Sequence, residues 1–162
     1  MIVEVLDLKT HMDDRGDLTE LVHVHELANH QFGQVYCVRN ERPEIIRAFH
    51  RHRELWDYFT IVHGKAMFWF VTGDNQDAQK VVLGAHPMQL IIVPPTVWHG
   101  WMSLVPDTIL ISTASHVYDH NNPDEERIPH DHFSIHRPIS TDRVRVAGVV
   151  PSNEVSWAIT IK

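Results

Sequence analysis

The chain has 162 residues, of which 22% are charged and 43% hydrophobic, and its formal net charge is -7. This length predicts one domain over residues 1–162, large enough to bury its own core. The acidic balance, with no block of lysine and arginine, argues against nucleic acid or an anionic membrane as a partner. It still permits an anionic small ligand, because arginines such as Arg15 and Arg47 could cluster locally.

The N-terminal residues lack a basic region followed by an apolar run, and no apolar run is long enough to span a membrane. We therefore expect a cytoplasmic protein. The single cysteine, Cys37, cannot form an intramolecular disulfide or a thiolate metal site, and it reads as a small apolar strand residue.

Short apolar segments separated by turn signals predict an all-β barrel or sandwich, because no segment of ten or more residues has a helical apolar period. The predicted strands are residues 1–6, 18–24, 34–38, 45–50, 58–63, 66–71, 80–83, 90–93, 98–104 and 108–113. Turns are expected at residues 13–16, 40–43, 64–65 and 72–75. The polar segment 116–142 should run extended over the surface before two last strands at 144–150 and 155–161.

Two histidines one residue apart are the centre of the functional interpretation. On a strand, residues i and i+2 face the same side, so His50 and His52 should project together. Asp57 follows five residues after His52, and His99 comes just after a Pro-Pro turn. The working hypothesis is that these two stretches line one pocket inside a barrel.

Both stretches resemble the motifs of the cupin family. The spacing of residues 50–64, with its two histidines, carboxylate and glycine, resembles the first motif, with Asp57 where glutamate is usual. Residues 94–99 resemble the second motif, with Thr96 in place of glycine. The resemblance implies a cupin double-stranded β-helix, that is, a jelly-roll barrel.

Within the cupins, residues 14–132 resemble the nucleotide-sugar 3,5-epimerases, the dTDP-4-dehydrorhamnose epimerase family. The matching stretches are Asp14-Arg15-Gly16 with Glu20, Phe32-Gly33-Gln34, Arg47-Ala48-Phe49-His50, Pro94-Pro95 through His99-Gly100-Trp101, and Tyr118. The R-x-x-H-x-H pattern that begins at Arg47 also resembles the sugar-nucleotide 3,4-ketoisomerases.

The resemblance implies a substrate-binding set. Arg15 and Glu20 would contact the nucleotide, reaching from a neighbouring subunit. Gln34 and Arg47 would line the site, with Arg47 on the diphosphate or the sugar. His99 would also bind substrate.

It also implies a catalytic set. His50 would be the general base that removes a proton beside a 4-keto group, a task suited to an imidazole because the ketone acidifies that C–H bond. His52 would help to stabilise the enolate or anchor phosphate, and Asp57 would orient a histidine. Tyr118, or a water, would return the proton.

The chain departs from the epimerase pattern at three places. Asp57 stands where the family has a lysine, Ser112 stands where it has its acid tyrosine, and the loop between His50 and Gly64 is shorter. The resemblance therefore favours proton transfer on a keto-sugar nucleotide, as an epimerase or isomerase without a cofactor, over the specific double epimerisation.

Two alternatives remain open on sequence. His50, His52, Asp57 and His99 could bind one divalent transition metal, because imidazole and carboxylate suit such ions, as in a dioxygenase or metal isomerase. A non-catalytic sugar-nucleotide-binding cupin would also lose the lysine and the tyrosine; turnover or isotope exchange distinguishes it. Exposed sheet edges and a detached N-terminal strand favour a homodimer.

Overall fold

The computed structural model describes residues 1–73 and 78–133, and these residues are almost entirely β, as the sequence predicts. The described residues form twelve strands and two short 3-10 helices. The strands are β1 (Glu4–Asp7), β2 (Thr10–Asp13), β3 (Gly16–Thr19), β4 (Gln34–Asn40), β5 (Ile46–Arg51), β6 (Asp57–His63), β7 (Lys65–Val71), β8 (Gln79–Gly84), β9 (Gln89–Val93), β10 (Trp98–Ser103), β11 (Thr108–Ala114) and β12 (Glu126–Arg127), with helices η1 (Val24–Glu26) and η2 (Ala28–His30).

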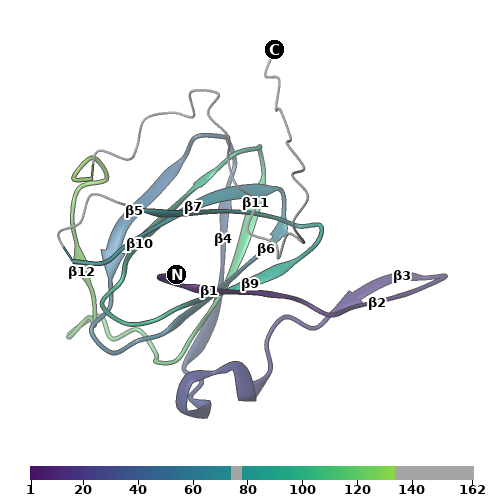
Figure 1. The fold of residues 1–162 in the computed structure, drawn as a ribbon, viewed down its shortest axis with the longest axis horizontal. Coiled ribbons are helices and arrows are strands. Elements are labelled where there is room, and N and C mark those ends of the chain that lie inside the picture. The colour runs from purple at the N-terminus through teal and green to yellow at the C-terminus, as the bar shows by residue number, and fades with distance from the viewer. Residues whose placement is uncertain (74–77, 134–162) are drawn as a thin grey trace.

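Two five-stranded antiparallel sheets pack face to face to form the barrel (Figure 1). One sheet has the strand order β1-β9-β6-β11-β4, and the other has the order β12-β5-β10-β7-β8. Strands distant in sequence are therefore neighbours, as where β5 pairs with β10 and β6 pairs with β11. This arrangement confirms the predicted jelly-roll barrel.

The main core lies between the two sheets, because alternate side chains of each strand point inward. Phe59 and Ile61 of β6 meet Phe68 and Phe70 of β7 there. The intervening residues of β7 lie in a second apolar cluster with Phe49, Trp98 and Phe133. Because β7 is buried on both faces, it reads as a continuous apolar run rather than an alternating one.

The predicted strands agree with the observed ones to within a few residues, with one exception. Residues 18–24 were expected to form one strand, but β3 ends at Thr19 and Val24 begins η1. The reason is that β2, its partner, spans only Thr10–Asp13, so the chain loses its ladder beyond the pair of Thr10 and Thr19. Predicted strands 144–150 and 155–161 lie outside the described residues.

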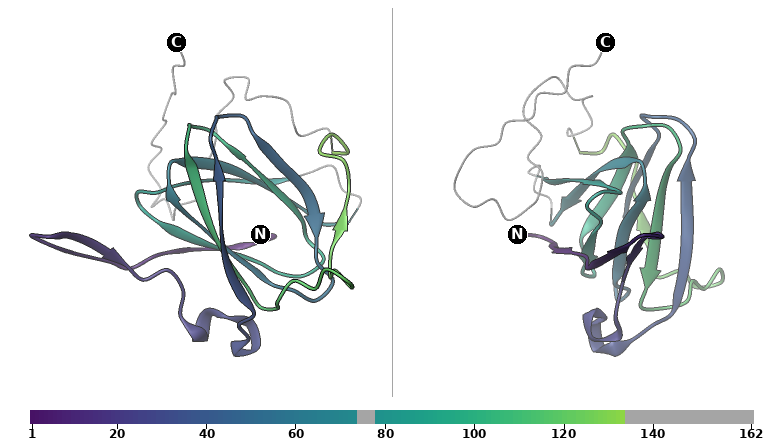
Figure 2. Two further views of the ribbon diagram at one scale, coloured as in Figure 1. Left: turned by 180° about the vertical axis from the view of Figure 1, so that it is seen from behind. Right: turned by 90° about the vertical axis from the view of Figure 1, so that its right-hand side faces the viewer.

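The β2–β3 hairpin projects away from the barrel (Figures 1 and 2). It exposes apolar side chains, since Met12 is 82% and Leu18 61% accessible. In the described part of the chain the only helices are η1 and η2, and neither could cross a membrane.

Glycine at position 100 allows β10 to approach β5 closely. A Cβ placed on Gly100 would lie 2.2 Å from the Cβ and 2.7 Å from the Cα of Ala48. We expect Gly100→Ala to lower the free energy of unfolding by about 1–3 kcal/mol, because backbone must move to relieve the clash. Denaturant unfolding measures this.

Gly84→Ala is the matched control, because the nearest atom to its added Cβ is 3.7 Å away. This change should shift the free energy of unfolding by no more than about 0.5 kcal/mol. Equal effects of the two substitutions would contradict the close approach.

Candidate functional site

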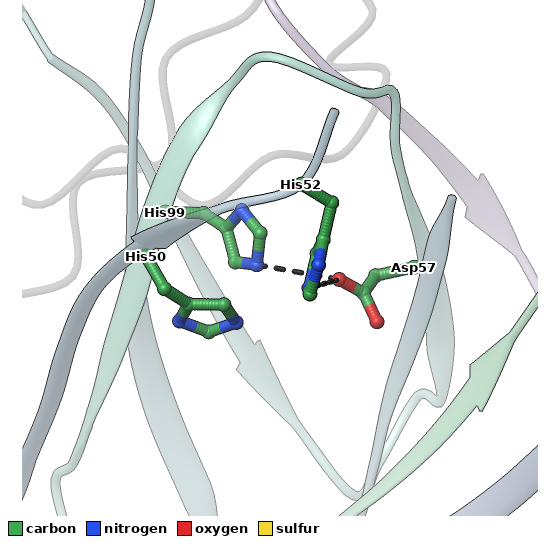
Figure 3. A group of neighbouring side chains, drawn as sticks. All are labelled: His50, His52, Asp57 and His99. Atoms are coloured by element: carbon green, nitrogen blue, oxygen red, sulfur yellow. Dashed lines mark ion pairs between the residues drawn. The ribbon is translucent and has the colours of Figure 1, made fainter. Parts of the chain in front are cut away.

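Three strands bring four predicted residues together inside the barrel (Figure 3). His50 lies on β5 and His52 directly after it, while Asp57 begins β6 and His99 lies on β10. One ligand atom from each residue lies within 4.8 Å of the others. We call these four residues the histidine–aspartate cluster.

Strand pairing explains this convergence. His99 on β10 stands directly opposite His50 on β5 in the antiparallel ladder, and the two rings meet edge to face with centroids 4.2 Å apart. Asp57 comes from the opposing sheet, where it lies on the same inward face of β6 as Phe59 and Ile61. The cluster therefore adjoins the apolar core, and the His99 and Phe59 rings lie 5.6 Å apart.

The carboxylate of Asp57 is at the centre of the cluster. Its Oδ2 lies 3.3 Å from Nε2 of His52 and 3.3 Å from Nε2 of His99. Asp57 and His99 are each only 2% exposed, and His52 is 8% exposed. Burying a carboxylate is costly unless positive or polar groups compensate it, so these contacts must offset a substantial desolvation cost.

Backbone carbonyls hold the far side of both imidazoles. Nδ1 of His52 donates to the carbonyl of Asp124 at 2.5 Å, and Nδ1 of His99 donates to the carbonyl of Val97 at 2.9 Å. A carbonyl can only accept, so Nδ1 of each ring carries a proton. The two Nε2 atoms consequently face Asp57.

Electrostatics separates the charge states within the cluster. Burial raises the pKa of Asp57, but its contacts with His52 and His99 outweigh this and bring the pKa well below the usual range. Burial lowers the pKa of His50 well below its ordinary value, helped by His99. Burial also lowers the pKa of His52, but Asp57 reverses the shift and the net pKa is raised. His50 is therefore the uncharged imidazole at neutral pH.

Sequence reasoning missed Tyr36. On β4, Tyr36 stands directly opposite Ser112 of β11, and its hydroxyl is hydrogen-bonded to Ser112, which in turn donates to Asp57 Oδ1 at 3.5 Å. Burial of the hydroxyl, with the charge of Asp57, raises the pKa of Tyr36 to about 12. A phenol thus lies beside the position where the epimerase pattern has its tyrosine. Gln34 is two residues earlier, so alternation places Tyr36 on the strand face of a predicted site residue, but it does not reveal that Tyr36 stands opposite Ser112.

Gln34 and Tyr118 lie together at the end of the barrel where β4 begins and β11 ends, which we call the rim. The backbone N–H of Tyr118 donates to Gln34 Oε1 at 3.2 Å, and the Tyr118 hydroxyl donates to Glu125 Oε1 at 3.5 Å. Arg127 binds the same carboxylate through two contacts of 2.9 and 3.0 Å. A hollow of about 370 Å³ near this rim is lined by residues that include His52 and Tyr118.

The remaining predicted residues lie apart from the cluster within one chain. Arg47 donates to Asn40 Oδ1 at 2.8 Å. Arg15 lies in the turn of the β2–β3 hairpin and is paired with Asp13, while Glu20 lies 3.6 Å from His11. The β2–β3 hairpin, whose turn holds Arg15, projects away from the barrel (Figure 1).

The family model for FdtA, described as WxcM-like, C-terminal, matches residues 1–127. The chain belongs to this family. The match covers the barrel and every residue of the histidine–aspartate cluster.

Two curated relatives and a solved structure resemble the chain. "Probable low-salt glycan biosynthesis epimerase Agl13" of Haloferax volcanii is 31% identical, over 80% of this chain and 87% of its own. "TDP-4-oxo-6-deoxy-alpha-D-glucose-3,4-oxoisomerase" of Aneurinibacillus thermoaerophilus is 28% identical, over 72% and 81%. QdtA, a sugar 3,4-ketoisomerase of Thermoanaerobacterium thermosaccharolyticum solved with TDP, has a TM-score of 0.68 and 20% identity, over 82% and 93%. This last likeness confirms the cupin fold.

Asp124 fixes the loop that carries His52. Its carboxylate accepts the backbone N–H groups of Arg53, Glu54 and Leu55 at 3.1, 3.0 and 2.9 Å, while its carbonyl accepts from the His52 ring. We expect Asp124→Ala to lower the free energy of unfolding by about 1–3 kcal/mol, because these donors lose a charged acceptor.

Denaturant unfolding would measure that loss. Asp119→Ala is the control, because Asp119 accepts one N–H, from Asn121, in an exposed loop. An Asp124→Ala protein as stable as the Asp119→Ala protein would contradict a role for Asp124 in holding the loop.

Proposed function

We propose that the protein is an epimerase or isomerase that acts on a nucleoside-diphospho-4-keto-6-deoxysugar by removing the proton beside the ketone. The observation that carries the proposal is the placement of His50 in the barrel beside the buried His52–Asp57–His99 group. The names of the relatives, a glycan biosynthesis epimerase and a 3,4-oxoisomerase, support this class of substrate. Epimerisation and keto migration both begin with the same proton abstraction.

His50 is the proposed base. Its uncharged imidazole accepts the proton of the carbon next to the ketone, and the electron pair of the broken C–H bond moves onto the keto oxygen to give an enolate. In an epimerase the proton returns to the same carbon from the other face. In a ketoisomerase the proton is delivered instead to the former carbonyl carbon. The hydroxyl proton of the neighbouring oxygen moves to the former keto oxygen, so that the ketone migrates by one carbon.

The enolate needs a donor or a positive charge near its oxygen, and the epimerase lysine is absent here. Asp57 favours the charged form of His52, which supplies positive charge at the site. Tyr36 supplies a phenol that stays protonated at neutral pH. We therefore assign to Tyr36 the proton return that the sequence suggested for Tyr118, and we place Tyr118 at the rim in contact with the substrate.

The nucleotide would occupy the rim near Tyr118 and Gln34. Arg127, which shares the Glu125 carboxylate with Tyr118, is a cation that this chain offers to the diphosphate there, whereas Arg47 is bonded to Asn40 at the opposite end of β4 from Gln34. Arg15 and Glu20 would reach the site of a second subunit in a homodimer, because the hairpin that carries Arg15 extends away from its own barrel. The apolar side chains exposed on that hairpin support such pairing. The sugar product would enter a surface glycan.

Replacement of the base tests the proposal. We expect His50→Gln to lower kcat on TDP-4-keto-6-deoxyglucose by about 10²–10⁴-fold, because a positioned general base contributes that much. Product formation can be followed by NMR. The control is His63→Gln, an exposed histidine at the other end of β6, about 20 Å along the strand from Asp57.

The control should retain full turnover. A His50→Gln protein with the wild-type kcat would rule out His50 as the base. Loss of turnover in both proteins would show that the effect is not specific to the cluster.

A second substitution tests the acid. Tyr36→Phe removes only the hydroxyl, so we expect kcat to fall by about 10²–10⁴-fold while KM changes by no more than a few-fold. Steady-state kinetics separate the two parameters. The matched variant Tyr118→Phe should raise KM more than it lowers kcat, and the reverse pattern would return the proton transfer to Tyr118.

A further inference from the structure

Glu125 and Arg127 form an ion pair at the start of β12. Nε of Arg127 donates to Oε1 of Glu125 at 2.9 Å, and Nη2 of Arg127 donates to Oε2 at 3.0 Å. The Glu125 side chain is only 11% exposed, whereas the Arg127 side chain is 71% exposed. A mostly buried carboxylate therefore holds a guanidinium group that remains open to solvent.

Strand pairing places Arg127 on the side of the sheet that carries the cluster. Arg127 stands opposite His50 in the antiparallel ladder of β12 and β5, and residues that stand opposite each other share a face. Glu126 projects to the other face, where it binds Arg51 at 2.7 Å. The guanidinium of Arg51 in turn lies 4.5 Å from the centroid of the Trp98 ring. Two adjacent glutamates thus hold two arginines on opposite faces of the sheet.

The geometry of the ion pair leaves Arg127 able to bind a second anion. A guanidinium group has five N–H donors, and Glu125 accepts one from Nε and one from Nη2. The remaining donors, on Nη1 and Nη2, form the free edge of the planar group, which suits a phosphate oxygen pair. Arg127 can therefore keep its contacts with Glu125 while it binds a ligand.

Glu125 also contacts the aromatic residue of the rim. The Tyr118 hydroxyl donates to Glu125 Oε1 at 3.5 Å, while the backbone N–H of Tyr118 donates to Gln34 Oε1 at 3.2 Å. Glu125 thus joins the two groups that the proposed function places against the nucleotide, Tyr118 and Arg127.

We propose that Glu125 is a positioning residue, which holds Arg127 in the orientation that binds the diphosphate of a nucleoside diphosphate. The proposal rests on the proposed function for the class of that ligand. A long exposed side chain loses its freedom when it binds a ligand, and this loss weakens binding by about 3–10-fold. Glu125 fixes the guanidinium before the ligand arrives, so binding avoids most of that loss.

The negative charge of Glu125 makes the sign of one effect decisive. A carboxylate near an anionic ligand repels it, so removal of that charge alone should tighten binding. The same holds if Glu125 blocks Arg127 and the diphosphate has to displace it. A carboxylate that positions Arg127 has the opposite effect, because its loss leaves the guanidinium free to move. Weaker binding after removal of a negative charge is therefore the signature of positioning.

Calorimetric titration of TDP into the protein measures these effects. Glu125→Gln keeps the shape of the side chain but loses one acceptor oxygen, and we expect it to raise the Kd of TDP by about 3–10-fold. Arg127→Gln should raise the Kd by about 10–100-fold, because a charged contact with phosphate is lost. Glu126→Gln is the matched control, since it removes the same charge from the next residue, on the opposite face. It should change the Kd by less than about twofold.

A double-substitution cycle separates positioning from general damage to the rim. In the Arg127→Gln background, Glu125→Gln should change the Kd by less than about twofold, because the group that it positions is already absent. Damage to the rim would weaken binding by the same factor in both backgrounds. Glu125→Asp is a second variant in case Glu125→Gln does not fold, which circular dichroism would show. It keeps the charge but withdraws the carboxylate from Arg127, so it should also raise the Kd.

Several results would overturn the proposal. These are wild-type protein that does not bind TDP, an Arg127→Gln protein with the wild-type Kd, and a folded Glu125 variant that binds TDP as tightly as the wild type or more tightly. An equal loss of affinity in both backgrounds of the cycle would overturn it as well.

Turnover of TDP-4-keto-6-deoxyglucose by the same proteins separates this proposal from the proposed function. Glu125→Gln should raise KM by about 3–10-fold and leave kcat within about twofold, because the loss falls on binding. TDP binding that depends on Glu125 and Arg127, without turnover, would support the positioning role and count against the reaction. Turnover with a Kd for TDP that neither substitution changes would overturn the positioning role and leave proton transfer by His50 standing.

Discussion

The buried carboxylate of Asp57 is the constraint on which the rest of the site depends. It lies at the edge of the apolar core between two imidazoles, and each is 3.3 Å away. Such a group is tolerated only if positive charge is supplied beside it, so Asp57 dictates the charge state of its neighbours. His50 makes no ion pair with Asp57 (Figure 3), and its pKa is lowered. It is therefore the histidine that is left uncharged.

The fold creates this arrangement by joining distant parts of the chain. Pairing of β5 with β10 sets His50 against His99, and the opposing sheet brings Asp57 across the barrel. Gly100 permits the close approach of β10 to Ala48 at the point where the register between β5 and β10 shifts. Asp124 then holds the loop after β5, because its carboxylate accepts the backbone N–H groups of Glu54 and Leu55. Its backbone carbonyl accepts from the His52 ring, so one residue links the stability of the loop to the orientation of His52.

Much of this was predictable from local patterns, and the exceptions have physical reasons. The His50-x-His52 spacing and the second motif at His99 identified the cluster, because strand alternation fixes which side chains share a face. Tyr36 was missed because its importance depends on standing opposite Ser112, and that register between β4 and β11 cannot be read from either strand alone. The prediction of a strand through residue 24 was wrong because strand propensity carries no information on where the partner strand ends.

Deuterium wash-in tests the central claim, proton abstraction beside the ketone, most directly. TDP-4-keto-6-deoxyglucose would be incubated with the protein in D₂O, and carbons 3, 4 and 5 would be followed by NMR. The account predicts that deuterium enters at carbon 3 or 5 if the protein is an epimerase and at carbon 4 if it is a ketoisomerase, and that His50→Gln abolishes the exchange. Conversion of the sugar without deuterium at any of these carbons, or exchange that survives the loss of His50, would contradict it.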